Sequence, residues 1–179
     1  MKPLLALSTA IDALNERLSH IANWCVLLSV LISAGNALMR YGFNFSSNAW
    51  LEIQWYMFGA MFMLGAPYTL RRNEHVRVDV VYGSLAPRLK LWVDLLGGIL
   101  FLLPPVMVIG WMSWPLFYES LVSGETSNNA GGLIRWPVKL FLPLGFGLLA
   151  LQGVSEIIKR AAALAGHQGE IADYGKPAQ

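Results

Sequence analysis

Charged residues, cysteine and histidine are all scarce in this chain. Only 13% of its 179 residues are charged and 55% are hydrophobic, whereas a soluble domain is usually about 25% charged. The single cysteine, Cys25, excludes an internal disulfide and a cysteine-based metal cluster. The sequence contains no phosphate-binding glycine loop, no paired catalytic carboxylates and no histidines at metal-ligand spacing. We therefore expect a protein that is not an enzyme, holds no cofactor or metal, and binds no nucleic acid.

The chain contains four long runs without a charged residue. They occupy residues 21–39, 53–70, 95–118 and 140–155. A helix needs about 20 apolar residues to cross the hydrocarbon core, and a chain in lipid must satisfy its backbone hydrogen bonds within the segment. We predict one all-α integral membrane domain over residues 1–179. Its expected parts are four transmembrane helices near 21–39, 50–70, 92–116 and 138–158, and a cytoplasmic tail over 160–179.

The N-terminal segment, residues 1–20, has an amphipathic helical pattern. Its apolar positions recur at helical spacing, at Leu4, Leu7, Ile11, Leu14 and Leu18. Polar positions lie opposite, at Asp12, Asn15, Glu16 and Ser19. Two interpretations follow: an amphipathic helix on the membrane surface that turns into the first span, or a simple cytoplasmic extension of that span.

The distribution of basic residues predicts the orientation. Ten of the 13 lysines and arginines flank the spans on the side of the two termini. The other side has three: Arg40, Arg135 and Lys139. Positively charged flanks stay in the cytoplasm. Both termini are therefore expected to be cytoplasmic, and the loops near 40–50 and 117–137 to face the periplasm of a bacterial inner membrane.

The stretch TLRRNEHVRVDVV, residues 69–81, places charges directly after the second span. Its alternating pattern resembles a strand, but no second strand-like segment exists to pair with it. We predict an interfacial turn and a short helix here, with Pro87 opening the third span. On a continuing helix Arg71, His75 and Asp79 would share one face. With Arg72 they are predicted to anchor the chain to lipid headgroups or a partner, rather than to relay protons.

The second and third spans carry features suited to packing. Trp50 opens the second span, and Glu52, Gly59 and Ala66 follow at steps of seven, which predicts a seam with a carboxylate at its outer end. The interpretation of Glu52 stays open between a structural and a functional role. Pro104 and Pro105 in the third span are expected to free backbone carbonyls and break the helix.

The outer loop, residues 118–136, is long, polar and rich in glycine. Such a loop suits a mobile contact surface, with Glu119, Glu125 and Arg135 as its polar contacts. A plain solvated connection is the alternative.

Two histidines leave a redox function open. His20 and His75 lie on the same predicted side, as the axial ligands in a haem-bearing membrane anchor would. Both lie at span ends, although haem ligands need a buried, walled site. A haem or quinone anchor and a stand-alone structural membrane protein are the alternatives to the function described next.

The stretch NAWLEIQWYMFGAMFMLGAPYTLRRNEHVRVDVVYGSL resembles the DctQ-like small membrane subunit of TRAP (tripartite ATP-independent periplasmic) transporters. The later stretch GGLIRWPVKLFLPLGFGLLALQGVSEIIKR is similar to the same family. The resemblance covers roughly residues 15–160. It rests on the order of a tryptophan and an acid opening the second span, a late Gly-Ala pair, then basic residues, a histidine and Val-Asp.

This resemblance implies a small permease subunit that forms part of a fixed scaffold. Its partners would be a large multispan permease, which holds the substrate and ion sites, a periplasmic substrate-binding protein, and membrane lipids. Import of an organic acid would be driven by an ion gradient, usually of sodium, without ATP.

Overall fold

The structure is a computed structural model that describes residues 2–45, 47–75 and 82–167. Its regular elements over these ranges are all helices, and the one β-type pairing is an isolated bridge between Thr126 and Ile134. The elements are α1 (Lys2–Phe43), α2 (Asn48–Arg72), α4 (Pro87–Gly97), the π-helical η1 (Gly98–Leu102), α5 (Leu103–Ser123) and α6 (Trp136–Leu164).

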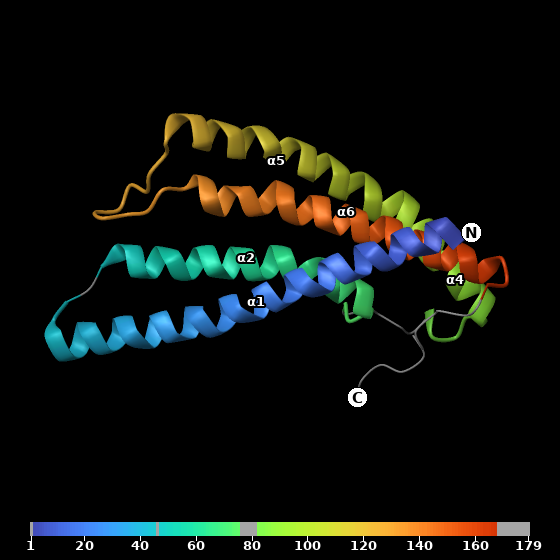
Figure 1. Cartoon of the computed structure of the whole chain (residues 1–179), viewed down its shortest axis with the longest axis horizontal. Coiled ribbons are helices and arrows are strands. Elements are labelled where there is room, and N and C mark those ends of the chain that lie inside the picture. The colour runs from blue at the N-terminus through green and yellow to red at the C-terminus, as the bar shows by residue number, and fades with distance from the viewer. Residues whose placement is uncertain (1, 46, 76–81, 168–179) are drawn as a thin grey trace.

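Four long helices lie side by side and alternate in direction (Figure 1). α6 is central, because it packs against α1, α2, α4, η1 and α5, whereas α5 packs mainly on α6. One end of the array holds the N-terminus, the C-terminal end of α2 and α4, and we call it the N-terminal end. The opposite end holds the α1–α2 connection and residues 124–135, and we call it the hairpin end.

Local sequence signals explain where the helices begin and end. The Ser47 side chain accepts a hydrogen bond from the Ala49 amide and caps α2. Asn73 ends α2 in the left-handed region at φ 56°, and its amide and that of Glu74 bond back to carbonyls of the last turn. Gly124 ends α5 in the same way, at φ 61°. Pro87 opens α4, as predicted from its sequence position.

Among the described residues, three stretches are long and apolar enough to cross a membrane: α1, the continuous run Pro87–Ser123, and α6. α2 is not among them, although its 25 residues extend about 37 Å at 1.5 Å per residue. Tryptophan, tyrosine, glutamine and glycine interrupt its aliphatic residues. The prediction of an all-helical protein with several membrane-length helices is confirmed, and α2 as a fourth span stays a prediction.

α1 is one helix of 42 residues, with no break near residue 20. The predicted turn between a surface helix and the first span is therefore wrong, and the segment continues the helix of the first span. The cytoplasmic location of this extension stays a prediction. The polar side of its N-terminal half faces the other helices, where Ser8, Asn15 and Ser19 are buried. Leu4, Leu7 and Leu14 face outward, whereas Ile11 is buried and Leu18 packs against the hydrophobic core. Hydrogen-bond partners on α6 explain this orientation, as described below.

The buried residues of α2 match the predicted seam only in part. The buried residues of α2 are Glu52, Ala60, Leu64 and Pro67, whereas Gly59 and Ala66 are only partly buried. Two of the three predicted positions still pack inside the chain: Glu52 is buried, and a Cβ atom on Gly59 would lie 3.5 Å from Val138 of α6.

The break predicted in the third span lies in the run Pro87–Ser123, where the π-helical η1 interrupts the α-helix. The Leu103 amide reaches back five residues to the Gly98 carbonyl. Pro104 and Pro105 follow directly and have no amide hydrogen to donate, which explains why regular α-helical bonding is interrupted here.

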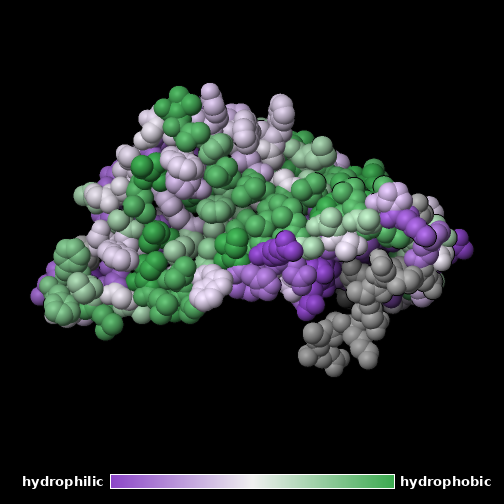
Figure 2. All heavy atoms as spheres, in the orientation of Figure 1, coloured by the Kyte–Doolittle hydropathy of each residue, from purple (hydrophilic) through white to green (hydrophobic). Residues whose placement is uncertain are grey.

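Apolar side chains cover much of the outside of the helices. Figure 2 shows them along the visible face, with hydrophilic side chains gathered near the place where α1 passes the C-terminal end of α2. On α5, Trp111, Met112 and Val122 are at least 70% exposed. A surface of this kind requires lipid or another apolar chain around it.

Candidate functional sites at the two ends of the helices

Residues 124–135 form a short hairpin, and we call this segment the hairpin. Besides the Thr126–Ile134 bridge, the Ser127 amide bonds to the Leu133 carbonyl at 2.9 Å, and the Arg135 amide to the Glu125 carbonyl at 2.9 Å. The tip is tight at Gly132, where a Cβ atom would lie 2.5 Å from that of Ser127. These bonds favour a fixed surface over the mobile loop that the composition suggested.

Glu52 of α2 fastens the hairpin to the helices. Its carboxylate accepts hydrogen bonds from the Ser127 hydroxyl, from the Asn129 side-chain amide at 2.7 Å, and from the Leu133 backbone amide at 2.7 Å. The residue is only 4% exposed. One turn earlier on α2, the Asn48 side chain donates to the Ala130 carbonyl at 3.1 Å. Glu52 thus binds the hairpin, a partner that its position in the sequence does not indicate.

Glu125 binds two basic residues at the base of the hairpin. Arg135 Nη1 lies 3.2 Å from its Oε1, and Lys139 of α6 binds its Oε2. The hydrogen bond from Lys139 is the largest cause that lowers the pKa of the Glu125 carboxyl from 4.5 to about 2. Two of the three predicted docking residues, Glu125 and Arg135, therefore pair with each other.

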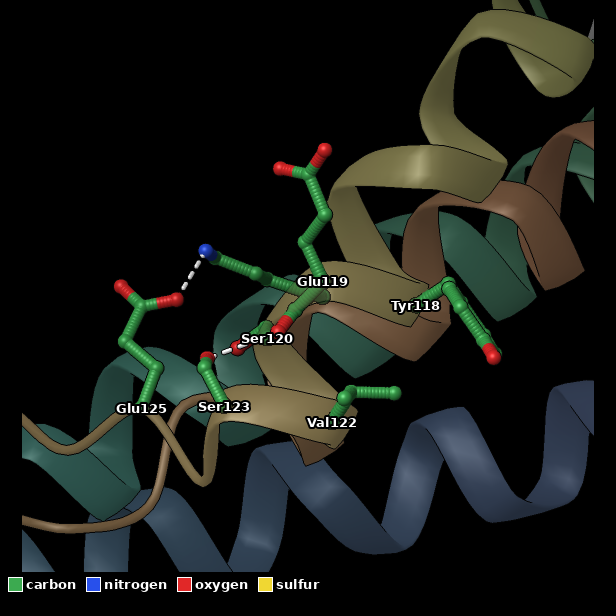
Figure 3. Close-up of a pocket in the computed structure, with 7 residues that line it drawn as sticks. Tyr118, Glu119, Ser120, Val122, Ser123 and Glu125 are labelled. Carbon is green, nitrogen blue, oxygen red and sulfur yellow. Dashed lines mark hydrogen bonds and ion pairs between the residues drawn. The ribbon is translucent and has the colours of Figure 1, made fainter.

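Glu119 is placed differently. It lies on the last turns of α5 and lines a pocket of about 470 Å³ together with Tyr118, Val122 and Glu125. Figure 3 shows its carboxylate pointing away from the Glu125–lysine pair. Within the described residues it makes no ion pair. Of the three predicted docking residues, it is the one left available to a partner.

A polar network at the N-terminal end joins α1 to α6. Gln152, fully buried, donates to Asp12 Oδ1 at 2.8 Å and accepts from the Asn15 side chain at 2.7 Å. Ser155 donates to the same Asp12 oxygen at 2.8 Å, and Lys159 lies 2.9 Å from Asp12 Oδ2. These hydrogen bonds offset the cost of burying the polar groups in an apolar surrounding. Asn15 Oδ1 is the exception, since it is buried and has no hydrogen-bond partner within the described residues.

The ionic part of this network extends to α4. Arg160 binds Glu156 Oε2 at 2.6 Å and lies 3.4 Å from Asp94 Oδ2. Sequence analysis did not single out Glu156, Lys159 and Arg160 as a site. Their spacing of three and four on one helix was the available signal.

The two predicted anchor arginines have different environments. Arg71 Nη1 donates to Glu16 Oε2 at 3.0 Å and to the Asp12 carbonyl at 3.2 Å, so it ties the end of α2 to α1. Arg72 is 58% exposed and lies 3.4 Å from the equally exposed Glu74. Arg71 is thus part of the fold, and only Arg72 faces the surroundings.

The rest of the predicted anchor is not a helical face. α2 ends at Arg72, so His75 lies beyond the helix, in a bend, and is exposed. The prediction that Arg71 and His75 share one face of a continuing helix is wrong, because Asn73 terminates it. Asp79 lies outside the described residues, as do all of residues 76–81 of the predicted interfacial segment.

The other predicted interface residues of α2 differ in exposure: some face the surroundings and others face neighbouring helices. Trp50 is 48% exposed at the hairpin end. A Cβ atom on Gly59 would lie 3.5 Å from Val138, so this glycine faces α6. Ala66 is partly buried. Gly59 therefore supports packing within the chain.

An all-helical chain with long apolar helices and charges at their ends is a multi-pass membrane protein. The family described as tripartite ATP-independent periplasmic transporters, DctQ component, matches residues 29–163. The chain belongs to this family, as the resemblance implied.

One relative of known designation agrees with this assignment. A protein of Haemophilus influenzae named "Putative TRAP transporter small permease protein" is 38% identical over 61 residues. The match covers 34% of this chain and 37% of that protein. No solved structure matches the chain significantly.

Proposed function

We propose that this chain is the scaffold-forming small permease subunit of a TRAP transporter that imports an organic acid. A large multispan permease subunit would hold the substrate and the coupling ion, for which sodium is our proposal. A periplasmic binding protein would deliver the substrate. The family assignment supports the role of the chain, and the resemblance described above motivates its substrate class and partners.

One observation carries the scaffold role. The charged side chains of the described residues gather at the two ends of the helices, and the runs between them are uncharged. Secondary transporters bind substrate near the membrane midplane, where broken helices and polar groups meet. Between these ends, the described helices carry no Asp, Glu, Lys or Arg side chain that could bind an organic acid or a cation. Their exposed apolar faces suit contact with a larger permease and with lipid.

The two ends have separate proposed roles. The excess of basic residues near the termini supports a cytoplasmic N-terminal end and a periplasmic hairpin end. The hairpin end would then receive the binding protein, with Glu119 as a direct contact. At the cytoplasmic end, Arg72 and His75 would meet lipid phosphates or the partner permease.

Co-purification and reconstitution test the proposal. The chain, carrying an affinity tag, should bring a multispan permease with it in mild detergent. The pair in liposomes should take up an organic acid when the binding protein and a sodium gradient are present, and the chain alone should not. Uptake by the chain alone would overturn the scaffold role. A Soret band in the purified chain would favour the haem-anchor alternative.

A further inference from the structure

We propose that Glu52 and Asn48 form a clasp that holds the hairpin in one conformation, so that its uncharged tip is a preformed docking surface for the periplasmic binding protein. This inference rests on the proposed function for its partner. The clasp itself rests on contacts within the chain. Glu52 is thus a positioning residue, which acts on docking through the hairpin and does not touch the partner.

The two clasp residues are arranged to act together. Asn48 and Glu52 are four residues apart on the first turns of α2, so their side chains share one face. Asn48 holds the tip through the Ala130 carbonyl, and Glu52 holds both strands of the hairpin, through Ser127 and Asn129 on one side and Leu133 on the other. A segment of twelve residues is thereby fixed at four points.

A carboxylate is chemically suited to this position. All three groups that bind Glu52 are donors, and a carboxylate offers only acceptors. Its bonds to neutral donors are strengthened by its charge and by its burial at 4% exposure. Glutamine would present an NH₂ group to at least one donor, and alanine would leave all three donors without their acceptor.

The charged groups of the hairpin and of its clasp bind partners within the chain. Glu52 faces inward, and Glu125 pairs with Arg135 and Lys139. The exposed tip residues Asn128, Ala130 and Gly131 carry no charge. The surface therefore suits a protein partner that forms neutral hydrogen bonds with amides and backbone groups. Such a contact depends weakly on ionic strength.

A fixed hairpin would favour binding for an entropic reason. A flexible loop loses conformational freedom when a partner orders it, and this loss weakens affinity. With the clasp intact, the loop is already ordered before the partner arrives. Release of the clasp should therefore weaken docking without altering the transport step itself.

Hairpin mobility is the first measurement. A nitroxide is attached to Asn128→Cys in a Cys25→Ser background, in the assembled membrane complex, so that the label has a single site. The label should be immobile with Glu52 present, partly mobile in E52Q, and strongly mobile in E52A. The matched control is E119Q, which removes a carboxylate at the same end that has no bond to the hairpin. An immobile label in E52A would overturn the clasp.

Docking is the second measurement. Uptake by the reconstituted complex is measured as a function of the concentration of the binding protein. The binding protein used is one with which the wild-type complex takes up substrate. The half-saturating concentration should rise about tenfold in E52A, which corresponds to about 1.4 kcal/mol, and less in E52Q and N48A. The maximal rate should be unchanged.

The outcomes separate the clasp from the proposed function. A mobile label with an unchanged half-saturating concentration would show that the hairpin is not the docking surface. A lower maximal rate with an unchanged half-saturating concentration would indicate a structural defect and would overturn the positioning role. If the wild-type complex takes up nothing with any binding protein, both the proposed function and the docking role are wrong. The mobility of the label would still show whether Glu52 holds the hairpin.

Discussion

Gln152 of α6 donates a hydrogen bond to Asp12 of α1 at 2.8 Å, across 140 positions of the sequence. The same glutamine accepts from Asn15, one turn further along α1. This relationship turns the buried polar residues of the N-terminal segment toward the other helices and leaves Leu4, Leu7 and Leu14 outside. The N-terminal half of α1 is thus part of the helical array rather than a separate surface element.

Gln152→Leu should destabilise the protein by about 1–3 kcal/mol. The leucine leaves the buried Asn15 side-chain amide without its acceptor and removes one of the donors to Asp12. Thermal unfolding in detergent measures the change. Thr9→Val is the control, because Thr9 is exposed and bonds only within its own helix. Equal melting temperatures for the two variants would show that the network contributes little.

Gly145→Ala should separate α6 from α2 and destabilise the protein by about 1–3 kcal/mol. The added Cβ atom would lie 2.6 Å from Met63 Cβ and 3.0 Å from the Met63 carbonyl oxygen, which is backbone and cannot swing away. Gly147→Ala is the matched control, since its Cβ atom would meet nothing within 4 Å. The prediction fails if both alanines shift the unfolding temperature alike.

Arg71→Gln should lower the yield and thermal stability of the protein, and Arg72→Gln should not. Arg71 joins the end of α2 to Asp12 and Glu16, and it is 28% exposed. Arg72 forms a surface pair with Glu74, and such pairs contribute about 0–1 kcal/mol. Membrane yield and melting temperature of the two variants decide the point. A larger effect of Arg72→Gln would instead favour its role as a lipid or partner anchor.

Asn128 and His167 should label from opposite sides of the membrane. Single cysteines at these exposed positions, in the Cys25→Ser background, are treated with an impermeant thiol reagent in intact cells. The cysteine at 128 should react at once, and that at 167 only after permeabilisation, because the basic flanks stay in the cytoplasm. The reverse pattern would invert the proposed orientation.

Acid should loosen the base of the hairpin only well below pH 5. The folded-state pKa of Glu125, about 2, lies below its ordinary value of 4.5. The pairing of Glu125 therefore stabilises the folded hairpin fully above pH 4.5, and this stabilisation is lost as the pH falls toward 2. A nitroxide at Thr126→Cys, again with Cys25→Ser, should become mobile between pH 4.5 and 2.

The control for this titration is Glu125→Gln, in which the label should already be more mobile at pH 7. Any acid dependence that this variant retains belongs to Glu52, which holds the same hairpin. A transition that is complete above pH 5 in the unmodified hairpin would contradict the assignment to Glu125.

The sequence by itself determined that the protein is helical, where the apolar parts of its helices lie, and that charge is confined to their ends. Uncharged runs of this length have one stable form in lipid, because only a helix satisfies the backbone within the segment. The helices extend beyond the predicted spans at both ends, since composition marks where a helix is apolar but not where it stops. The stops depend on caps such as Asn73 and Gly124.

Only the tertiary structure decided which side of each helix faces inward and which polar groups meet. Glu52 and the hairpin are up to 81 residues apart, and Asp12 and Lys159 are 147 apart. The partner of such a group depends on the rotation and the neighbours of each helix, and helical periodicity leaves both undetermined. The amphipathic pattern of α1 was visible in the sequence, but its polar side found buried partners rather than water, because α6 supplies matching donors and acceptors at the same height.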